Sequence, residues 1–254
     1  MVDIILHGCN GRMGQMITGI VAEDPDSRIT AGVDITGEKK NDYPVFTTLE
    51  DCDIKADVVI DFGNAAAVDH LLDWCVQNQI PCVECTTGLS DEQIKHLEDC
   101  AGKVAILKSA NMSLGINVLM KLLAEATKVF ADAGFDIEIV EKHHRMKLDA
   151  PSGTALALAD AINEAADNQY DYVYDRSQVR QKRGSKELGI SAIRGGTIVG
   201  DHDVIFAGTD EVITFSHRVY SRAVFGKGAV EAAKFLKGKP AGHYTMKDVV
   251  RRTA

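Results

Sequence analysis

The first part of the chain, up to about residue 110, alternates short apolar segments with longer amphipathic ones, and this alternation limits the possible folds most. The apolar segments predict strands at residues 2–8, 28–34, 56–62, 80–87 and 103–110. Helical patterns separate most of them, at residues 12–24, 65–77 and 91–100. Repeated alternation of apolar strands with helices predicts an α/β fold with a doubly wound parallel sheet.

A glycine-rich turn follows the first predicted strand. Gly8, Gly11 and Gly14 form a G-x-x-G-x-x-G pattern that leads into the first predicted helix. Glycines let a backbone approach a pyrophosphate closely, and a helix N-terminus supplies unpaired N–H groups. Asp34 ends the next predicted strand, where a carboxylate would accept hydrogen bonds from an adenosine ribose. The pattern favours a Rossmann-type dinucleotide-binding domain over a tight turn without a ligand.

The residues around Asp34 also bear on the choice of nicotinamide cofactor. A carboxylate at this position repels the 2′-phosphate of NADP, and Ile35 rather than an arginine follows it. Lys39 and Lys40 lie a few residues further on and could receive that phosphate. We therefore expect NADH as the cofactor, with NADPH as an open alternative.

From Asn111 onward the pattern changes to that of a second domain. A long helix is expected at residues 115–131, and a second helix at residues 151–166. Three later strands are separated by turns rich in Gly and Asp, and they fall within residues 189–196, 197–208 and 210–219. Such turns predict antiparallel hairpins within a mixed sheet. The last residues, from 226 onward, return to a helical pattern.

Charge, hydropathy and cysteine content exclude several classes of protein. The formal net charge of -9 argues against a broad surface for nucleic acid or anionic membranes. The sequence shows no signal peptide and no apolar run near the ~20 residues that span a bilayer, so we expect a cytoplasmic protein. Cys82-x-x-Cys85 lies in a predicted strand, where residues three apart point to opposite faces. We therefore expect reduced, structural thiols and no metal site.

Residues 141–155, EKHHRMKLDAPSGTA, crowd titratable and hydrogen-bonding groups before a predicted helix. Unpaired N–H groups at a helix start favour an anion, and Lys147 adds a full positive charge. His143 and His144 can be neutral or charged near pH 7. Each feature alone is typical of surface polarity or a helix cap. Together, beside a nucleotide-binding fold, they predict a pocket for a small anion with an ammonium as proton donor. We call residues 141–155 the signature segment.

Residues 138–155 closely resemble the signature of the 4-hydroxy-tetrahydrodipicolinate reductase (dihydrodipicolinate reductase) family. The resemblance extends over essentially the whole chain, through the segments HGCNGRMG, ECTTGLS, SANMSLGIN and HRVYSRAVFGKGAVEAAKFL. It implies an NAD(P)H-dependent reduction of 4-hydroxy-tetrahydrodipicolinate to tetrahydrodipicolinate in the diaminopimelate route to lysine.

The resemblance also implies roles for individual residues. His143 would donate or accept a proton and Lys147 would donate one. The substrate carboxylates would be held by His144, Gly153 and Thr154. The cofactor would be contacted by Gly8, Cys9, Asn10, Gly11, Arg12, Met13, Asp34, Cys85, Thr86, Thr87, Ser109, Ala110, Asn111 and Met112. The chain departs from the family pattern at Cys85, where glycine is frequent, and at Gly63, where Ser or Thr is usual.

The family's architecture implies a dinucleotide-binding domain at residues 1–111 and 223–254, because the C-terminal helices would return to it. Residues 112–222 would then form an inserted domain for substrate binding and oligomerisation, and its sheet would build a homotetramer. Two other functions share the glycine-rich turn and Asp34. One is a nicotinamide-dependent amino-acid dehydrogenase of similar two-domain build, and the other is a non-catalytic, nicotinamide-sensing binding protein.

Overall fold

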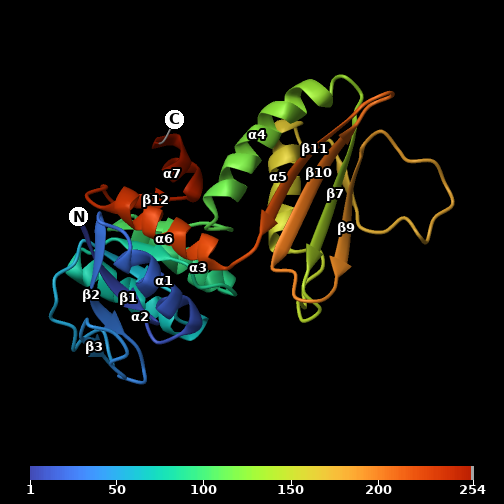
Figure 1. The fold of residues 1–254 in the computed structure, drawn as a ribbon. Coiled ribbons are helices and arrows are strands. Elements are labelled where there is room, and N and C mark those ends of the chain that lie inside the picture. The colour runs from blue at the N-terminus through green and yellow to red at the C-terminus, as the bar shows by residue number, and fades with distance from the viewer. Residues whose placement is uncertain (253–254) are drawn as a thin grey trace. The chain divides into compact units, whose positions relative to one another are not determined.

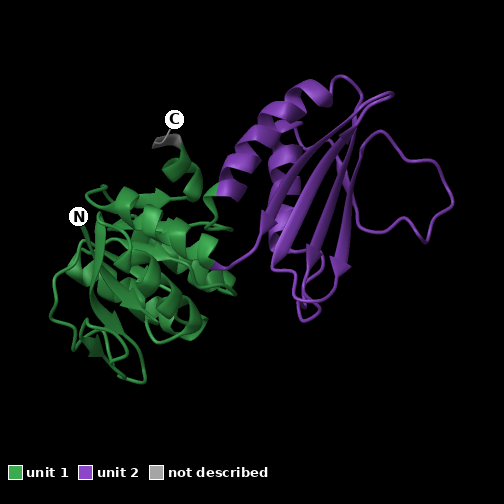
Figure 2. Cartoon of the chain, viewed as in Figure 1, with its two compact units in different colours: residues 1–114, 223–254 green, residues 115–222 purple. Residues whose placement is uncertain are grey.

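The computed structural model describes residues 1–252, with the side chains of residues 1–250. The chain forms two compact units (Figure 2). The first contains Met1–Leu114 and Ala223–Ala254, and the second contains Gly115–Arg222. Each unit has its own sheet, and the expected fold class of a doubly wound parallel sheet with an inserted mixed-sheet domain is confirmed.

The sheet of the first unit has seven strands in the order β12-β6-β5-β4-β1-β2-β3. All neighbouring strands in it are parallel. The strands are β1 (Val2–His7), β2 (Ser27–Val33), β3 (Val45–Phe46), β4 (Val58–Asp61), β5 (Cys82–Glu84), β6 (Ala105–Lys108) and β12 (Gly242–Tyr244). The helices are α1 (Arg12–Ala22), α2 (Ala65–Asn78), α3 (Asp91–Ala101), α6 (Ala223–Leu236) and α7 (Met246–Arg252).

Both faces of this sheet are covered by helices (Figure 1). On one face, Ile4 and Leu6 of β1 pack in a core with residues of α1 and α6. On the other face, Ile5 packs in a core with residues of α2 and α3. Because successive strand residues alternate between two buried faces, the strands are apolar throughout, as the sequence pattern predicted.

The second unit pairs two long helices with a five-stranded mixed sheet, in the order β11-β10-β7-β9-β8. The helices α4 (Leu114–Phe130) and α5 (Gly153–Ala165) lie on the same side of the sheet (Figure 1). The strands are β7 (Asp136–His143), β8 (Asp171–Val173), β9 (Glu187–Arg194), β10 (Gly200–Ala207) and β11 (Val212–Val219). Ile137, Ile139, Val204 and Phe206 line the core between sheet and helices.

The hairpins expected from the sequence are only partly correct. β10 and β11 do form an antiparallel hairpin. β9 does not pair with β10, because β7 lies between them and pairs parallel with β9. The chain passes from β7 through α5 to the edge strand β8 as a β-α-β crossover, and β9 then enters the sheet between these two strands. Apolar residues of β7 and β9 come together on the helix-covered face. Turn composition could not reveal this pairing, because the two strands are far apart in sequence.

The helix expected at residues 151–166 begins two residues later than predicted. Ser152 is its N-cap, and its hydroxyl accepts a hydrogen bond from the Ala155 amide. Pro151 therefore precedes the helix and does not form its first turn. In the described part of the chain, the helices are too short or too polar to cross a bilayer.

Candidate active site

The glycine-rich turn has the close backbone packing that a phosphate-binding turn requires. Gly8 has a positive φ of 75°, and a Cβ atom there would lie 2.6 Å from the carbonyl oxygen of Phe62. A Cβ at Gly14 would lie 2.3 Å from the carbonyl oxygen of Gly8. Gly11 is the N-cap of α1, and no side chain caps this helix. The turn thus fits a dinucleotide pyrophosphate at the N-terminus of α1.

Asp34 lies directly after β2 and holds this turn. Its carboxylate accepts a hydrogen bond from the Asn10 amide at 3.0 Å and two from Thr36 at 3.0 and 3.1 Å. The neighbouring Cys9 is fully buried, so its thiol does not face a ligand. Arg12 is exposed at the start of α1. Asn10 and Asp34 therefore meet at one edge of the sheet, although they follow two different strands.

The other residues that the resemblance assigns to the cofactor follow the next strands at the same edge. Cys85, Thr86 and Thr87 come directly after β5, and residues 109–112 come directly after β6. Thr87 is exposed, whereas Thr86 and the side chain of Met112 are buried. The predicted cofactor residues thus follow the carboxyl ends of parallel strands or, for Arg12 and Met13, lie in the first turn of α1, which is where doubly wound sheets bind ligands.

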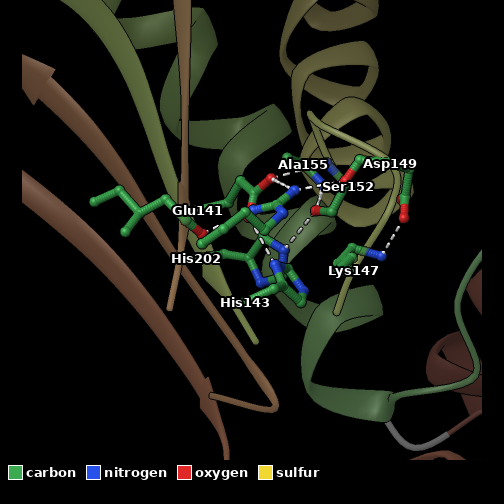
Figure 3. Close-up of polar contacts among 9 residues, drawn as sticks. Glu141, His143, Lys147, Asp149, Ser152, Ala155 and His202 are labelled. Atoms are coloured by element: carbon green, nitrogen blue, oxygen red, sulfur yellow. Dashed lines mark hydrogen bonds and ion pairs between the residues drawn. The ribbon is translucent and has the colours of Figure 1, made fainter. Parts of the chain in front are cut away.

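In the second unit, β7 ends in a buried histidine–carboxylate pair (Figure 3). His143 Nδ1 lies 2.6 Å from Glu141 Oε2, and the two side chains share the inner face of the strand. Arg194 of β9 binds both Glu141 oxygens, at 2.7 and 2.8 Å, and the Ser152 amide donates to Glu141 Oε1. Burial opposes ionisation, yet these hydrogen bonds hold the pKa of Glu141 below its usual range. Glu141 is therefore a buried, charged acceptor that orients His143.

A second buried histidine lies beside the first. His202 of β10 and His143 have ring centroids 5.2 Å apart in an edge-on arrangement. Ser152 Oγ accepts from the Ala155 amide and forms a second hydrogen bond, 3.1 Å long, with His202 Nε2. Burial, followed by the effect of His143, lowers the pKa of His202 to about 4. Burial also lowers the pKa of His143, against the opposing effect of Glu141. Both imidazoles are therefore neutral near pH 7.

We expect the stability of the protein to fall in mild acid because of His202. Its pKa is lower in the folded state than the ordinary value of 6.5, so the unfolded chain binds the extra proton. The free energy of unfolding should therefore have its full value above pH 6.5. It should decrease by up to about 3 kcal/mol as the pH falls toward 4. Urea unfolding across this range, in the wild type and in His202→Gln, measures the effect. The exposed His70→Gln variant is the control, and equal pH slopes in all three proteins would contradict the prediction.

Lys147 lies in the loop between β7 and α5. Its ammonium Nζ is 2.8 Å from Asp149 Oδ1, and 22% of its side chain is exposed (Figure 3). Against the opposing effect of burial, the hydrogen bond from Lys147 lowers the pKa of Asp149. Gly153 and Thr154 form the first turn of α5 next to this pair. The predicted proton donor and the predicted helix N-terminus are thus near one another.

A pocket of about 420 Å³ opens beside the same loop. It is lined by His144, Arg145 and Met146 of the signature segment, by Gly196 and Thr197, and by Arg222. Its volume suits a small molecule, and its two guanidinium groups suit an anion.

Sequence reasoning gave no role to Glu141, Arg194 or His202. Glu141 did carry a signal, because it stands two residues before His143 and therefore on the same face of a strand. Arg194 and His202 come from two other strands and carried no such signal.

One cluster of potential metal ligands also lies outside the predicted residues. Asp73 of α2 and His96 and Cys100 of α3 each place one ligand atom within 4.8 Å of the others. His96 Nε2 is 3.1 Å from Asp73 Oδ1 and 3.6 Å from Cys100 Sγ. The ion pair between His96 and Asp73 accounts for this arrangement, and the absence of a metal stays a prediction.

Comparisons with known proteins identify the family. The sequence model described as "Dihydrodipicolinate reductase, N-terminus" matches residues 2–112, and that described as "Dihydrodipicolinate reductase, C-terminus" matches residues 115–250. The chain is 52% identical to the 4-hydroxy-tetrahydrodipicolinate reductase of Caldanaerobacter subterraneus subsp. tengcongensis, over 99% of each chain. It is 47% identical to the protein of that name from Clostridium tetani, over 97% of this chain and 96% of the relative.

Solved structures agree with the sequence matches. Dipicolinate-bound dihydrodipicolinate reductase from Paenisporosarcina sp. TG-14 has a TM-score of 0.81 and 25% identity, over 98% of this chain and 99% of that one. GenD2 from gentamicin A biosynthesis, solved in complex with NAD, has a TM-score of 0.59 at 13% identity, over 98% of this chain and 90% of that one, and shares the fold. The resemblance drawn from residues 138–155 is confirmed. The chain belongs to the dihydrodipicolinate reductase family and is an oxidoreductase with a nicotinamide-binding unit.

Proposed function

We propose that this protein reduces 4-hydroxy-tetrahydrodipicolinate to tetrahydrodipicolinate with a nicotinamide cofactor, in the diaminopimelate route to lysine. The relatives that match over their full length carry the name of this activity. The observation that carries the proposal is the arrangement of the signature segment, where Lys147 lies beside the N-terminus of α5 and His143 is oriented by a buried carboxylate. The Paenisporosarcina relative binds dipicolinate, a small dianion of the same kind as the proposed substrate.

The protonation states of Lys147 and His143 decide which of the two residues donates the proton. Glu141 is ionised, so His143 places its proton on Nδ1 toward that carboxylate and remains neutral. A neutral imidazole is a poor acid, and the ammonium of Lys147 is therefore the proton donor. The cofactor, when bound, supplies the hydride. Lys147 stabilises the negative charge that develops on the substrate and then neutralises it with a proton. The hydroxyl group of the substrate leaves with a ring hydrogen as water, so the net reaction adds one hydride and one proton and releases one water.

The substrate carboxylates would be held by the start of α5 and by His144. Gly153 and Thr154 lie in the first helical turn, where N–H groups and the helix dipole favour an anion. His144 lines the pocket of about 420 Å³ together with Arg145 and Arg222. These groups supply several donors, which matches a substrate with two carboxylates.

The cofactor would be NADH, with NADPH accepted less well. Asp34 follows β2 at the position of the adenosine ribose, and its charge opposes a 2′-phosphate. Lys39 and Lys40 are both exposed a few residues further on, and their positive charges would allow weaker binding of the NADPH 2′-phosphate. We also propose that residues 1–111 and 223–254 bind the cofactor. Residues 112–222 would bind the substrate and build a homotetramer through their sheet.

The test is the loss of NADH absorbance when freshly generated cyclic substrate is added to the purified protein. We expect decay with NADH and slower decay with NADPH. Pyridine dicarboxylate should compete with the substrate and not with the cofactor. No decay with either cofactor would favour an amino-acid dehydrogenase or a nicotinamide-sensing protein, neither of which needs Lys147.

A further inference from the structure

Four adjacent parallel strands of the first unit end in a titratable residue. His7 ends β1, Asp61 ends β4, Glu84 ends β5 and Lys108 ends β6. The register pairs His7 with Asp61, Asp61 with Glu84, and Glu84 with Lys108. Because residues paired in register point to the same face of a sheet, the four side chains form one row. We call these four residues the strand-end row.

The interior of the row is buried, and its ends are basic. Asp61 and Glu84 are fully buried, whereas 14% of the His7 side chain and 20% of the Lys108 side chain are exposed. His7 Nδ1 lies 2.5 Å from Asp61 Oδ1, and Lys108 Nζ lies 3.9 Å from Glu84 Oε1. Two buried carboxyl groups side by side are costly, so a role beyond packing is expected of them.

The strand-end row forms hydrogen bonds with the amide, the hydroxyl and the carbonyl group of Thr86. Glu84 Oε1 accepts from the Thr86 amide at 2.7 Å, and Asp61 Oδ2 accepts from the Thr86 hydroxyl at 2.6 Å. Lys108 Nζ donates to the Thr86 carbonyl oxygen. Three members of the row thus fix this residue from β4, β5 and β6, and the exposed residues Thr87 and Gly88 follow it directly.

The fourth member of the row, His7, packs against Gly63. A Cβ atom at Gly63 would lie 2.9 Å from His7 Cε1 and 3.0 Å from Asp61 Oδ1. The Ser or Thr that the family pattern favours at this position would therefore crowd the imidazole. The Gly63 amide instead donates to Asp61 Oδ1 at 2.9 Å. Gly63 therefore leaves space for the His7 ring at one end of the row.

The strand order places the row relative to the cofactor. Asp34 marks the adenosine end beside β2, and the glycine-rich turn after β1 takes the pyrophosphate. A dinucleotide that continues in the same direction along this edge has its nicotinamide half over the ends of β4 and β5. The turn after β5, at Cys85 to Gly88, is therefore the part of the first unit next to that half.

We propose that Glu84 and Lys108 are positioning residues for the nicotinamide half of the cofactor and that they act through Thr86. This rests on the proposed function of the first unit. By holding the amide and the carbonyl of Thr86, they fix the peptide groups on both sides of it, so that Thr87 and Gly88 are presented in one conformation. A turn that is already ordered loses less conformational entropy when the ligand binds.

The electrostatics of the row predict which substitutions matter. Burial and the neighbouring Asp61 raise the pKa of Glu84 to about 9, so a neutral acid accepts from the Thr86 amide near pH 7. Glu84→Gln keeps a neutral acceptor of the same length, and it should keep the function. Glu84→Leu and Lys108→Met each remove one of the two bonds to the Thr86 backbone.

The experiment measures the affinity of the full-length protein for NADH and for ADP-ribose, which lacks the nicotinamide ring. We expect Glu84→Leu and Lys108→Met to weaken NADH binding about tenfold, which is about 1.4 kcal/mol. ADP-ribose binding should stay within about twofold in the same variants, and Glu84→Gln should bind both ligands as the wild type does. Lys95→Met and Glu98→Gln, two exposed positions of α3, are the matched controls.

The outcomes separate this inference from the proposed function. Wild-type protein that binds neither ligand would refute cofactor binding itself. Wild-type protein that binds both, with variants that lose both equally or lose neither, would overturn the positioning role alone. Should Glu84→Leu or Lys108→Met fail to fold, as judged by circular dichroism, Lys108→Gln is measured in the same way. It replaces the ammonium that donates to the Thr86 carbonyl oxygen by a shorter polar side chain, and it should weaken NADH binding more than ADP-ribose binding.

Discussion

Replacing Lys147 with alanine is expected to reduce turnover of the cyclic substrate by about 10²–10⁴-fold, the usual contribution of a general acid. The affinity for NADH should not change, because Lys147 belongs to the second unit and the glycine-rich turn to the first. His143 is neutral near pH 7, so it should not replace Lys147 as the acid. Single-turnover NADH oxidation measures the first quantity, and NADH titration measures the second.

Two further variants show whether the loss of turnover in Lys147→Ala comes from the missing proton donor. Lys147→Arg keeps the positive charge but holds its proton far more tightly, so it should restore dicarboxylate binding and not turnover. Lys142→Ala is the matched control, because Lys142 pairs with Asp203 at 2.9 Å and lies on the other face of β7. Near-normal turnover in a correctly folded Lys147→Ala protein would refute the role of Lys147 as proton donor.

Replacing Arg194 with methionine should cost about 3–5 kcal/mol in the free energy of unfolding. Both oxygens of Glu141 lose their guanidinium donor, while the carboxylate stays fully buried. Its remaining bonds, to His143 and to the Ser152 amide, cannot neutralise the charge. Urea denaturation at neutral pH measures the loss.

Arg28→Met is the control for this prediction. Arg28 also makes two bonds to a carboxylate, at 2.7 and 3.1 Å to Asp3, but 61% of its side chain is exposed. Exposed ion pairs contribute at most about 1 kcal/mol, so the two arginine variants should differ clearly. Equal losses in the two variants would show that the Glu141 charge does not depend on Arg194.

Five strands of the first unit could be predicted from local patterns because each is an apolar run next to an amphipathic helix, whereas the short strands β3 and β12 were not expected. Each apolar run became a strand of the parallel sheet, and the glycine-rich turn adopted the close packing that its glycines allow. The strand-end row could not be predicted from the sequence, for a physical reason. Each of its residues is visible at the end of an apolar run, but only the order of the strands brings Lys108 next to Glu84 and Asp61 next to His7.

The candidate site in the second unit was predicted only where its residues are close in sequence. His143, Lys147 and Gly153 stand within one segment that resembles the family signature. Arg194 and His202 reach the site from β9 and β10, and their positions depend on the pairing of both strands with β7. That pairing is decided by burial of apolar faces across the whole sheet, which local periodicity does not record.

The contact between Lys147 and Asp149 means that the ammonium already has a carboxylate partner. An ammonium has three N–H donors, so an incoming anion could share it with Asp149 or replace that residue. Because 55% of the Asp149 side chain is exposed, the contact is weak, and water can solvate a displaced carboxylate. Under the proposed function, Asp149 would therefore hold Lys147 in place before the substrate arrives, at little cost to substrate binding.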